Sequence, residues 1–143
     1  MKEILKYSNC FVCGEKNIGG LKARFFYDGE KAFTEIEASP HFEGYHGIYH
    51  GGVISSLLDE VMIKAILAKD LYVVTAEMTV RYKKPVTVGA RLIVSGQLTH
   101  QKGRMFFAEG ILKDNTDTVY ATATGKYIEA DESLRAQLMK SIE

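Results

Sequence analysis

The chain lacks a net charge, a long hydrophobic run and any internal repeat. Its 143 residues hold 18 lysines and arginines against 18 aspartates and glutamates, and this balance argues against a nucleic-acid surface or a polybasic membrane patch. No apolar run reaches membrane-spanning length, and the first residues, Met1 to Lys6, are too polar for a signal peptide. The sequence therefore predicts one cytoplasmic domain, residues 1–143, that binds neither nucleic acid nor membrane.

Cysteine is scarce as well. The chain has only Cys10 and Cys13, within Asn9-Cys10-Phe11-Val12-Cys13-Gly14, a spacing that suits half of a zinc site or a redox pair. Zinc normally takes four ligands, so a metal would need a histidine or the cysteines of a second copy. A thioredoxin-like role would need a βαβ unit after the motif, whereas a loop follows. We predict no metal and no other cofactor, with a metal at these cysteines as the alternative.

One stretch without proline or glycine organises the chain. From Val53 to about Ala68, apolar residues recur with a period near 3.6, which predicts a helix that is apolar almost all round and therefore buried. Glu60 and Lys64 form an i,i+4 pair that we expect on a solvated edge. Asp59 lies on another face, among small and apolar residues. Because burying an unpaired charge is costly, this carboxylate would need a partner or a chemical purpose.

Two glycines, Gly51 and Gly52, open this helix directly after His50. Backbone N–H groups at the start of a helix have no intrahelical acceptor, and the helix dipole favours negative charge there. Such an end can hold an oxyanion. In the simpler alternative the glycines only make a turn, His50 only caps the helix, and Asp59 only bonds to a neighbouring hydroxyl or backbone group.

The rest of the chain is rich in strand-forming residues separated by turn residues. Alternating apolar and polar residues predict strands over 21–27, 32–38, 73–82, 91–99, 105–113 and 119–128. A short amphipathic helix follows a capping Asp131. In the strand over 73–82, strict alternation places Thr75 and Tyr82 on opposite faces.

The order of these elements predicts an α+β fold, in which a curved antiparallel six-stranded sheet wraps around one long central helix and a short C-terminal helix ends the chain. One helix cannot cover both faces of such a sheet, and open sheet edges invite pairing. We therefore expect a second copy of the chain to cover the remaining surface, in a homodimer or in a dimer of dimers.

Together these features resemble the hotdog-fold acyl-CoA thioesterases, in the branch related to the phenylacetate-pathway enzyme. The resemblance is carried by the run Gly44-Tyr45-His46-Gly47-Ile48-Tyr49-His50-Gly51-Gly52, by Leu57-Leu58-Asp59-Glu60 after it, by the motif Asn9 to Gly14 and by the strand from Thr75 to Tyr82. It implies hydrolysis of acyl-CoA thioesters to a free acid and CoA, with CoA as part of the substrate.

The resemblance also implies roles for single residues. The N–H of Gly51 would polarise the thioester carbonyl, and Asp59 would act as the nucleophile or as the general base that aligns water. The hydroxyl of Thr75 would help to place that water, and His50 would lie beside the thioester. Either role of Asp59 fits an ionised carboxylate, which can attack directly or take a proton from water.

Helix geometry adds a prediction about assembly. Gly51 and Asp59 are eight residues apart, which is about 12 Å along a helix and too far for one carbonyl group to touch both. We therefore expect Asp59 to come from the facing subunit, so that a homodimer has two shared sites. Gly52 and Ser55 are further candidates for substrate contact. Because coenzyme A carries several phosphates, basic residues are candidates to bind it, namely Lys83, Lys84, Arg91 and Arg104.

Two alternatives remain. The run His41-Phe42-Glu43-Gly44 echoes the hotdog-fold 3-hydroxyacyl dehydratases, but the acid of that family would fall at Ser55. A non-catalytic acyl-CoA binding module would use the same pocket without turnover. Release of a thiol from an acyl-CoA ester separates the thioesterase from both.

Overall fold

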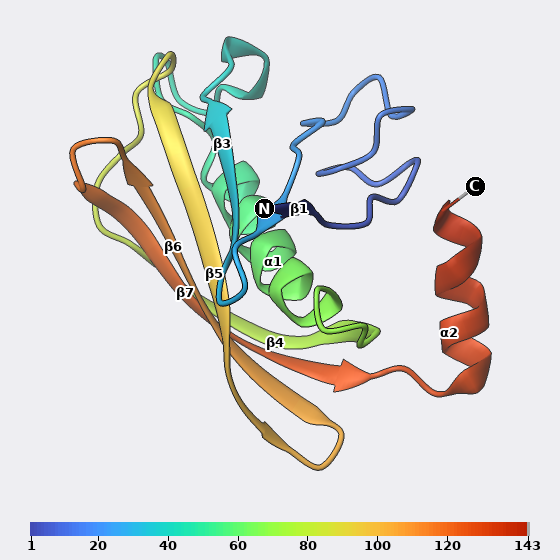
Figure 1. The fold of residues 1–143 in the computed structure, drawn as a ribbon. Helices are drawn as coiled ribbons and strands as arrows, with labels where there is room; N and C mark the ends of the chain where they lie inside the picture. Colours follow the sequence, from blue (N-terminus) through green and yellow to red (C-terminus); the bar gives the residue numbers. More distant parts are fainter. Residues whose placement is uncertain (143) are drawn as a thin grey trace.

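The computed structural model describes residues 1–142, and a curved antiparallel sheet wraps around one long helix (Figure 1). The strands are β1 (Lys2–Glu3), β2 (Phe26–Tyr27), β3 (Ala32–Glu37), β4 (Val73–Tyr82), β5 (Arg91–Lys102), β6 (Met105–Asp114) and β7 (Val119–Glu129). The helices are η1 (Pro40–Phe42), α1 (Gly51–Leu67), α2 (Glu132–Met139) and η2 (Lys140–Ile142). The sheet order is β1-β2-β3-β5-β6-β7-β4. The predicted fold class is confirmed, with a seventh short strand beyond the six expected.

The strand predicted over 21–27 is wrong for most of its length, since only β2 pairs within the sheet. The N–H groups of Leu21 and Ala23 instead donate to the carbonyls of Phe11 and Val12, both at 2.8 Å. Between them, Lys22 has a φ of 53°, which no regular strand contains. This segment therefore pairs with the cysteine-bearing loop rather than with β3.

A row of small residues sets the depth at which α1 lies in the sheet. Ala32, Gly96, Gly110 and Ala123 are successive cross-strand partners on β3, β5, β6 and β7. A Cβ atom added at Gly96 would lie 2.8 Å from the carbonyl oxygen of Val61 in α1. The backbone of the helix thus rests directly on β5, and no side chain fits between them.

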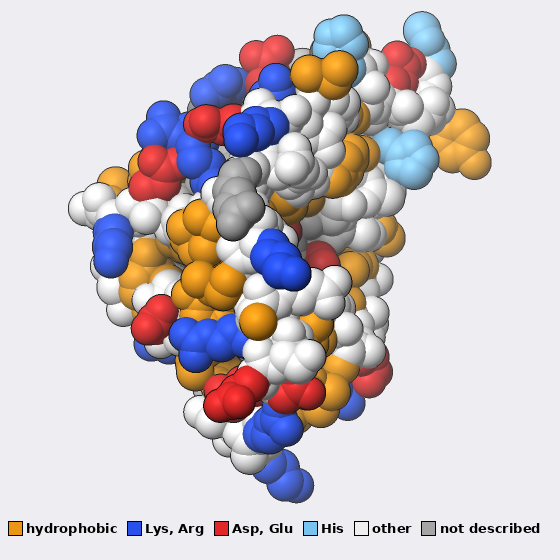
Figure 2. Space-filling view, turned by 90° about the vertical axis from the view of Figure 1, so that its right-hand side faces the viewer, with side chains coloured by type: hydrophobic (Ala, Val, Ile, Leu, Met, Phe, Trp, Pro, Cys, Tyr) orange, Lys and Arg blue, Asp and Glu red, His pale blue; other side chains and the backbone are white. Residues whose placement is uncertain are grey.

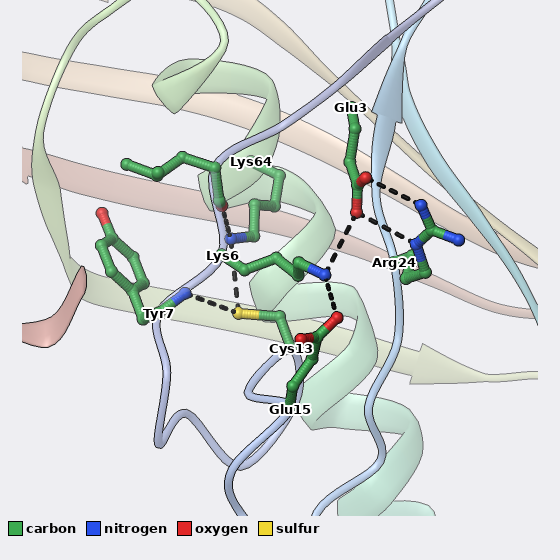
Figure 3. Close-up of polar contacts among 8 residues, drawn as sticks. Glu3, Lys6, Tyr7, Cys13, Glu15, Arg24 and Lys64 are labelled. Carbon is green, nitrogen blue, oxygen red and sulfur yellow. Dashed lines mark hydrogen bonds and ion pairs between the residues drawn. The ribbon is translucent and has the colours of Figure 1, made fainter. Parts of the chain in front are cut away.

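The Glu60–Lys64 pair is buried, so the prediction of a solvated edge was wrong. The Nζ of Lys64 lies 3.5 Å from Oε2 of Glu60, and the two side chains are 0% and 11% exposed. The N-terminal segment covers this side of α1: Lys64 donates to the carbonyl of Leu5 and lies 3.4 Å from Sγ of Cys13 (Figure 3). Burial raises the pKa of Glu60 to about 7.

Surface ion pairs hold this N-terminal segment in place (Figure 3). The guanidinium of Arg24 donates to both carboxylate oxygens of Glu3, at 2.9 and 3.1 Å. The ammonium of Lys6 contacts Glu15 and lies 3.5 Å from Glu3. These contacts connect the start of the chain to the segment that leads into β2.

The C-terminal helix α2 begins as predicted, with Asp131 accepting a hydrogen bond from the N–H of Leu134 at 2.8 Å. Beyond it, the carbonyl of Ser141 accepts from the N–H of Ser8 at 2.8 Å, so the N-terminal loop meets the C-terminal part of the chain. Figure 2 views the side of the molecule where they meet and shows hydrophobic side chains exposed in patches there. No helix formed by residues 1–142 is long and apolar enough to cross a membrane.

We expect Gly96→Ala to lower the free energy of unfolding by about 1–3 kcal/mol, because an added methyl group would overlap the backbone of α1. Gly19→Ala is the matched control: its Cβ would lie 3.7 Å from its nearest neighbour, which is ordinary contact. The control should change the free energy by less than about 0.5 kcal/mol. Denaturant unfolding of both variants beside the wild type measures the difference. Equal stability of all three proteins would show that α1 can move off β5 without cost.

Candidate active site

The start of α1 leaves one backbone N–H without an acceptor. His50 is the N-cap residue, and its Nδ1 accepts from the N–H of Gly52 at 2.8 Å. The N–H groups of Val53 and Ile54 donate to the His50 carbonyl at 3.0 and 3.1 Å. Within residues 1–142, the N–H of Gly51 has no such partner. This group is therefore the donor that the helix start can offer to a ligand.

The capping hydrogen bond also determines the tautomer of the neutral His50 ring. Because Nδ1 accepts from Gly52, the proton of the neutral ring lies on Nε2. His50 therefore has the capping role that the sequence offered as the simpler alternative. A hydrogen-bond donor at Nε2 remains available to a bound molecule.

Tyr82 and Ser55 lie beside this helix start. The Tyr82 hydroxyl donates to the carbonyl of Gly51 at 2.9 Å and is also in hydrogen-bond contact with the hydroxyl of Ser55. Ser55 thus contacts a tyrosine at the position where a dehydratase of this fold would need an acid. Because Ser55 cannot supply the acid, this geometry gives no support to the dehydratase alternative.

A bulge in β4 places Thr75 and Tyr82 on the same face of the strand. The pairing of β4 with β7 shifts register between Thr75 and Glu77, which leaves Ala76 as the extra residue. One extra residue reverses the alternation that follows it, so Thr75 and Tyr82 both face α1. The prediction that they lie on opposite faces was therefore wrong.

Two hydroxyl groups hold the carboxylate of Asp59. Thr75 Oγ1 donates to it, at 3.0 and 3.3 Å from the two oxygens, and the Tyr127 hydroxyl donates to Oδ1 at 2.9 Å. Asp59 is half-buried, whereas Tyr127 is fully buried. Burial, together with the negative charge of Asp59, raises the pKa of Tyr127. The tyrosine therefore remains a hydrogen-bond donor at neutral pH.

Tyr127 is a partner of Asp59 that was not predicted from the sequence. Its ring lies over Gly125, where an added Cβ would be 2.5 Å from Cε2 of the tyrosine. A glycine inside a strand often marks such a close approach. The glycine two positions before a tyrosine was thus the available signal, but only the structure shows that the hydroxyl reaches Asp59.

A cleft of about 610 Å³ opens at the start of α1. It is lined by His50, Gly51, Gly52 and Tyr82, together with residues of the segment 43–49. Histidine side chains gather at the upper end of the molecule in Figure 2, where Figure 1 places this segment. Asp59 does not line this cleft, so within one chain the free N–H and the carboxylate are not part of the same cleft.

The structure separates the four cations predicted to bind phosphate. Lys83 and Lys84 are exposed and directly follow Tyr82, so they lie at the cleft end of β4. Arg91 is at the start of β5, 3.9 Å from a glutamate of β3. Arg104 is in the turn between β5 and β6, where it donates to a backbone carbonyl of β7 at 2.8 Å. Within one chain, Arg104 therefore lies at the opposite end of the sheet from the cleft (Figure 1).

The fold is shared by a class of proteins that includes thioesterases. Residues 46–121, which are more than half of the chain, match the model of the Thioesterase superfamily, and the chain belongs to this family. The matched range includes His50, Gly51, Asp59 and Thr75 but ends before Tyr127.

Relatives with curated names support the same class. Acyl-coenzyme A thioesterase THEM4 of Mus musculus is 27% identical over 119 residues, which cover 82% of this chain and 51% of THEM4. This chain thus spans about half the length of the curated relatives it matches.

Solved structures share the fold. PaaI of E. coli, from the phenylacetic acid degradation operon, is 20% identical with a TM-score of 0.72, over 78% of this chain and 81% of PaaI. A hypothetical thioesterase of Streptococcus pneumoniae, solved with coenzyme A, is 18% identical with a TM-score of 0.68, over 71% of this chain and 82% of that one. The predicted family is confirmed, and PaaI shares its fold.

Two variants of the Streptococcus pneumoniae protein have also been solved. In one an aspartate is replaced by alanine, and in the other a threonine sixteen residues further along is replaced. Asp59 and Thr75 have the same separation in this chain.

We expect Tyr127→Phe to lower the free energy of unfolding by about 0.5–1.5 kcal/mol, because Asp59 loses one of its two hydroxyl donors. Tyr49→Phe is the control, since the Tyr49 hydroxyl is buried with no hydrogen-bond partner among residues 1–142. Its removal should not reduce stability. Denaturant unfolding at neutral pH, with Asp59→Asn added to complete a double-mutant cycle, measures the coupling. An equal loss in the two phenylalanine variants would contradict a specific bond to Asp59.

Proposed function

We propose that the protein hydrolyses acyl-CoA thioesters to a free acid and CoA. The observation that carries this proposal is the Gly51 N–H, which is left without an acceptor beside a cleft of about 610 Å³. The attack on a thioester places negative charge on the carbonyl oxygen, and a fixed N–H at the positive end of a helix stabilises that charge. The name of THEM4 and the coenzyme A in the Streptococcus pneumoniae structure favour acyl-CoA as the substrate class.

Asp59 acts as the nucleophile or as the general base. In one route its carboxylate attacks the thioester carbon, CoA leaves as a thiolate that takes a proton from water, and water then hydrolyses the mixed anhydride formed on Asp59. In the other route the carboxylate takes a proton from the attacking water and passes it to the sulfur of the leaving CoA. The hydroxyls of Thr75 and Tyr127 orient the carboxylate, because both donate to the same oxygen. The equal spacing of the aspartate and threonine chosen for substitution in the Streptococcus pneumoniae protein supports this pair.

The carboxylate acts on substrate held by another copy of the chain. Gly51 and Asp59 are separated by about 12 Å along α1, and Asp59 is absent from the cleft lining. The edge strand β4 carries both Thr75 and Tyr82, so a second copy packed there would meet both parts of the site. A homodimer, alone or within a dimer of dimers, then has two shared sites.

Other parts of the substrate meet residues near the helix start. Gly52 and Ser55 flank the reacting group, and Lys83 and Lys84 at the end of β4 bind phosphates of coenzyme A. Arg91 is a further candidate for binding these phosphates, and Arg104 could bind them only at a site shared between two copies of the chain. The cytoplasmic location stays a prediction.

We expect Gly51→Pro to reduce thiol release from acyl-CoA about 10²–10³-fold, because proline removes the oxyanion donor. Proline suits the first helical position, and His50, with φ −64° and ψ 130°, already has the extended backbone that must precede it. Gly51→Ala is the matched control. It keeps the N–H, and its Cβ would lie 3.6 Å from the Tyr82 ring, so it should retain most of the activity.

The assay follows thiol release from a panel of short, long and aromatic acyl-CoA esters. Asp59→Asn should abolish release while the protein stays folded. If the wild type binds coenzyme A but releases no thiol from any ester, the non-catalytic binding module is correct. If Asp59→Asn remains active, another group is the acid, and equal loss in Gly51→Pro and Gly51→Ala would exclude the N–H as the decisive feature.

The shared site predicts complementation between two inactive variants. Random mixing of Gly51→Pro and Asp59→Asn chains makes half of the dimers mixed, and each mixed dimer has one intact site of two. Mixing should therefore restore about a quarter of the wild-type specific activity. A site built within one chain predicts no recovery, because every chain then has one defect.

A further inference from the structure

A second cluster of reactive side chains lies outside the proposed active site. Cys10 and Cys13 from the N-terminal loop meet Glu60 from α1, and their two sulfurs and a carboxylate oxygen all lie within 4.8 Å of one another. Sγ of Cys10 is 3.8 Å from Oε1 of Glu60. Thiolates and carboxylates are zinc ligands, and ligand atoms of one tetrahedral ion are separated by roughly these distances.

The loop around the cysteines directs backbone N–H groups at both sulfurs. Those of Val12 and Cys13 donate to Sγ of Cys10 at 3.4 and 3.5 Å, and that of Tyr7 donates to Sγ of Cys13 at 3.5 Å (Figure 3). Hydrogen bonds of this kind stabilise a thiolate, which is the form that binds metal. Gly14 lets the loop close, since a Cβ there would lie 2.5 Å from the backbone nitrogen of Cys10.

The charge of the cluster suits a divalent cation. Two thiolates, the Glu60 carboxylate and the Lys64 ammonium together carry a net charge of minus two, which one divalent ion neutralises. Lys64 is fully buried and contacts both Cys13 and Glu60, at 3.4 and 3.5 Å. Lys64 can therefore donate hydrogen bonds that orient two of the metal ligands, although it does not bind the metal itself.

We propose that Cys10, Cys13 and Glu60 bind one Zn²⁺ per chain. Solvent supplies the fourth ligand, and the half-exposed Cys10 provides the path by which the ion enters. The ion joins the N-terminal loop to α1, so its role is structural and independent of thioester hydrolysis. The sequence alone favoured no metal because zinc takes four ligands and the chain has only two cysteines; Glu60 was predicted on a solvated edge, away from them.

The test uses the full chain, stripped of metal with a chelator under reducing conditions and titrated with Zn²⁺ at pH 8. We expect one zinc per chain and protection of both cysteines from alkylation. Cys10→Ser, Cys13→Ser and Glu60→Gln should each weaken binding, the cysteine variants by more than about 100-fold, since loss of an outer-shell partner alone costs 10–100-fold. His46→Asn removes an exposed histidine paired with Glu43 at 3.6 Å and should leave binding unchanged.

A second measurement keeps the proposal testable if a cysteine variant does not fold. Wild-type protein loaded with Co²⁺ should show the thiolate-to-cobalt charge-transfer absorption and the d–d bands of a tetrahedral site. Absence of the charge-transfer absorption would overturn the proposal. So would undiminished zinc affinity in folded Cys13→Ser, or loss of the bound zinc in His46→Asn, which would place the ion at the surface histidines.

Discussion

The helix α1 rests on a row of small residues that crosses the sheet, and the rest of the structure depends on this contact. At Gly96 the backbone of β5 touches the backbone of the helix, so no side chain separates the two. Because α1 lies so close to β5, the curved sheet brings β7 and β4 alongside the helix, and side chains from both strands contact it. The hydroxyls of Tyr127 and Thr75 meet Asp59 for this reason.

Two adjacent acids on α1 have different environments because consecutive helix residues point about 100° apart. Asp59 faces the strands, where two hydroxyls hold it and solvent still reaches it. Glu60 faces the N-terminal segment, where Lys64 and the two cysteine sulfurs surround it. One helix thus serves two sites: Asp59 belongs to the range that matches the Thioesterase superfamily, and the cysteines lie outside that range.

The proposed chemistry follows from how a helix spaces its groups. Donors without acceptors occur only at the start of a helix, whereas a carboxylate held by strand hydroxyls must lie where the helix crosses those strands. The two requirements place Gly51 and Asp59 about 12 Å apart. A second copy, with its helix reversed against the first, is the simplest way to bring them to one carbonyl group. The open edge of the sheet at β4 provides the surface on which such a copy can pack.

By itself the sequence determined the fold class, α1 to within two residues of its ends, the strands from β3 to β7, and the positions of Gly51 at the start of α1 and of Asp59 within it. Hydrophobic periodicity and the residues that begin a helix are local features, so the amino-acid sequence is enough to predict them. Only the tertiary structure decided that Tyr127 holds Asp59, that a bulge turns Tyr82 toward the helix, and that Glu60 is buried. Each of these depends on strand register, or on how a distant loop covers the helix. Those contacts join residues far apart in the chain, and no local pattern encodes them.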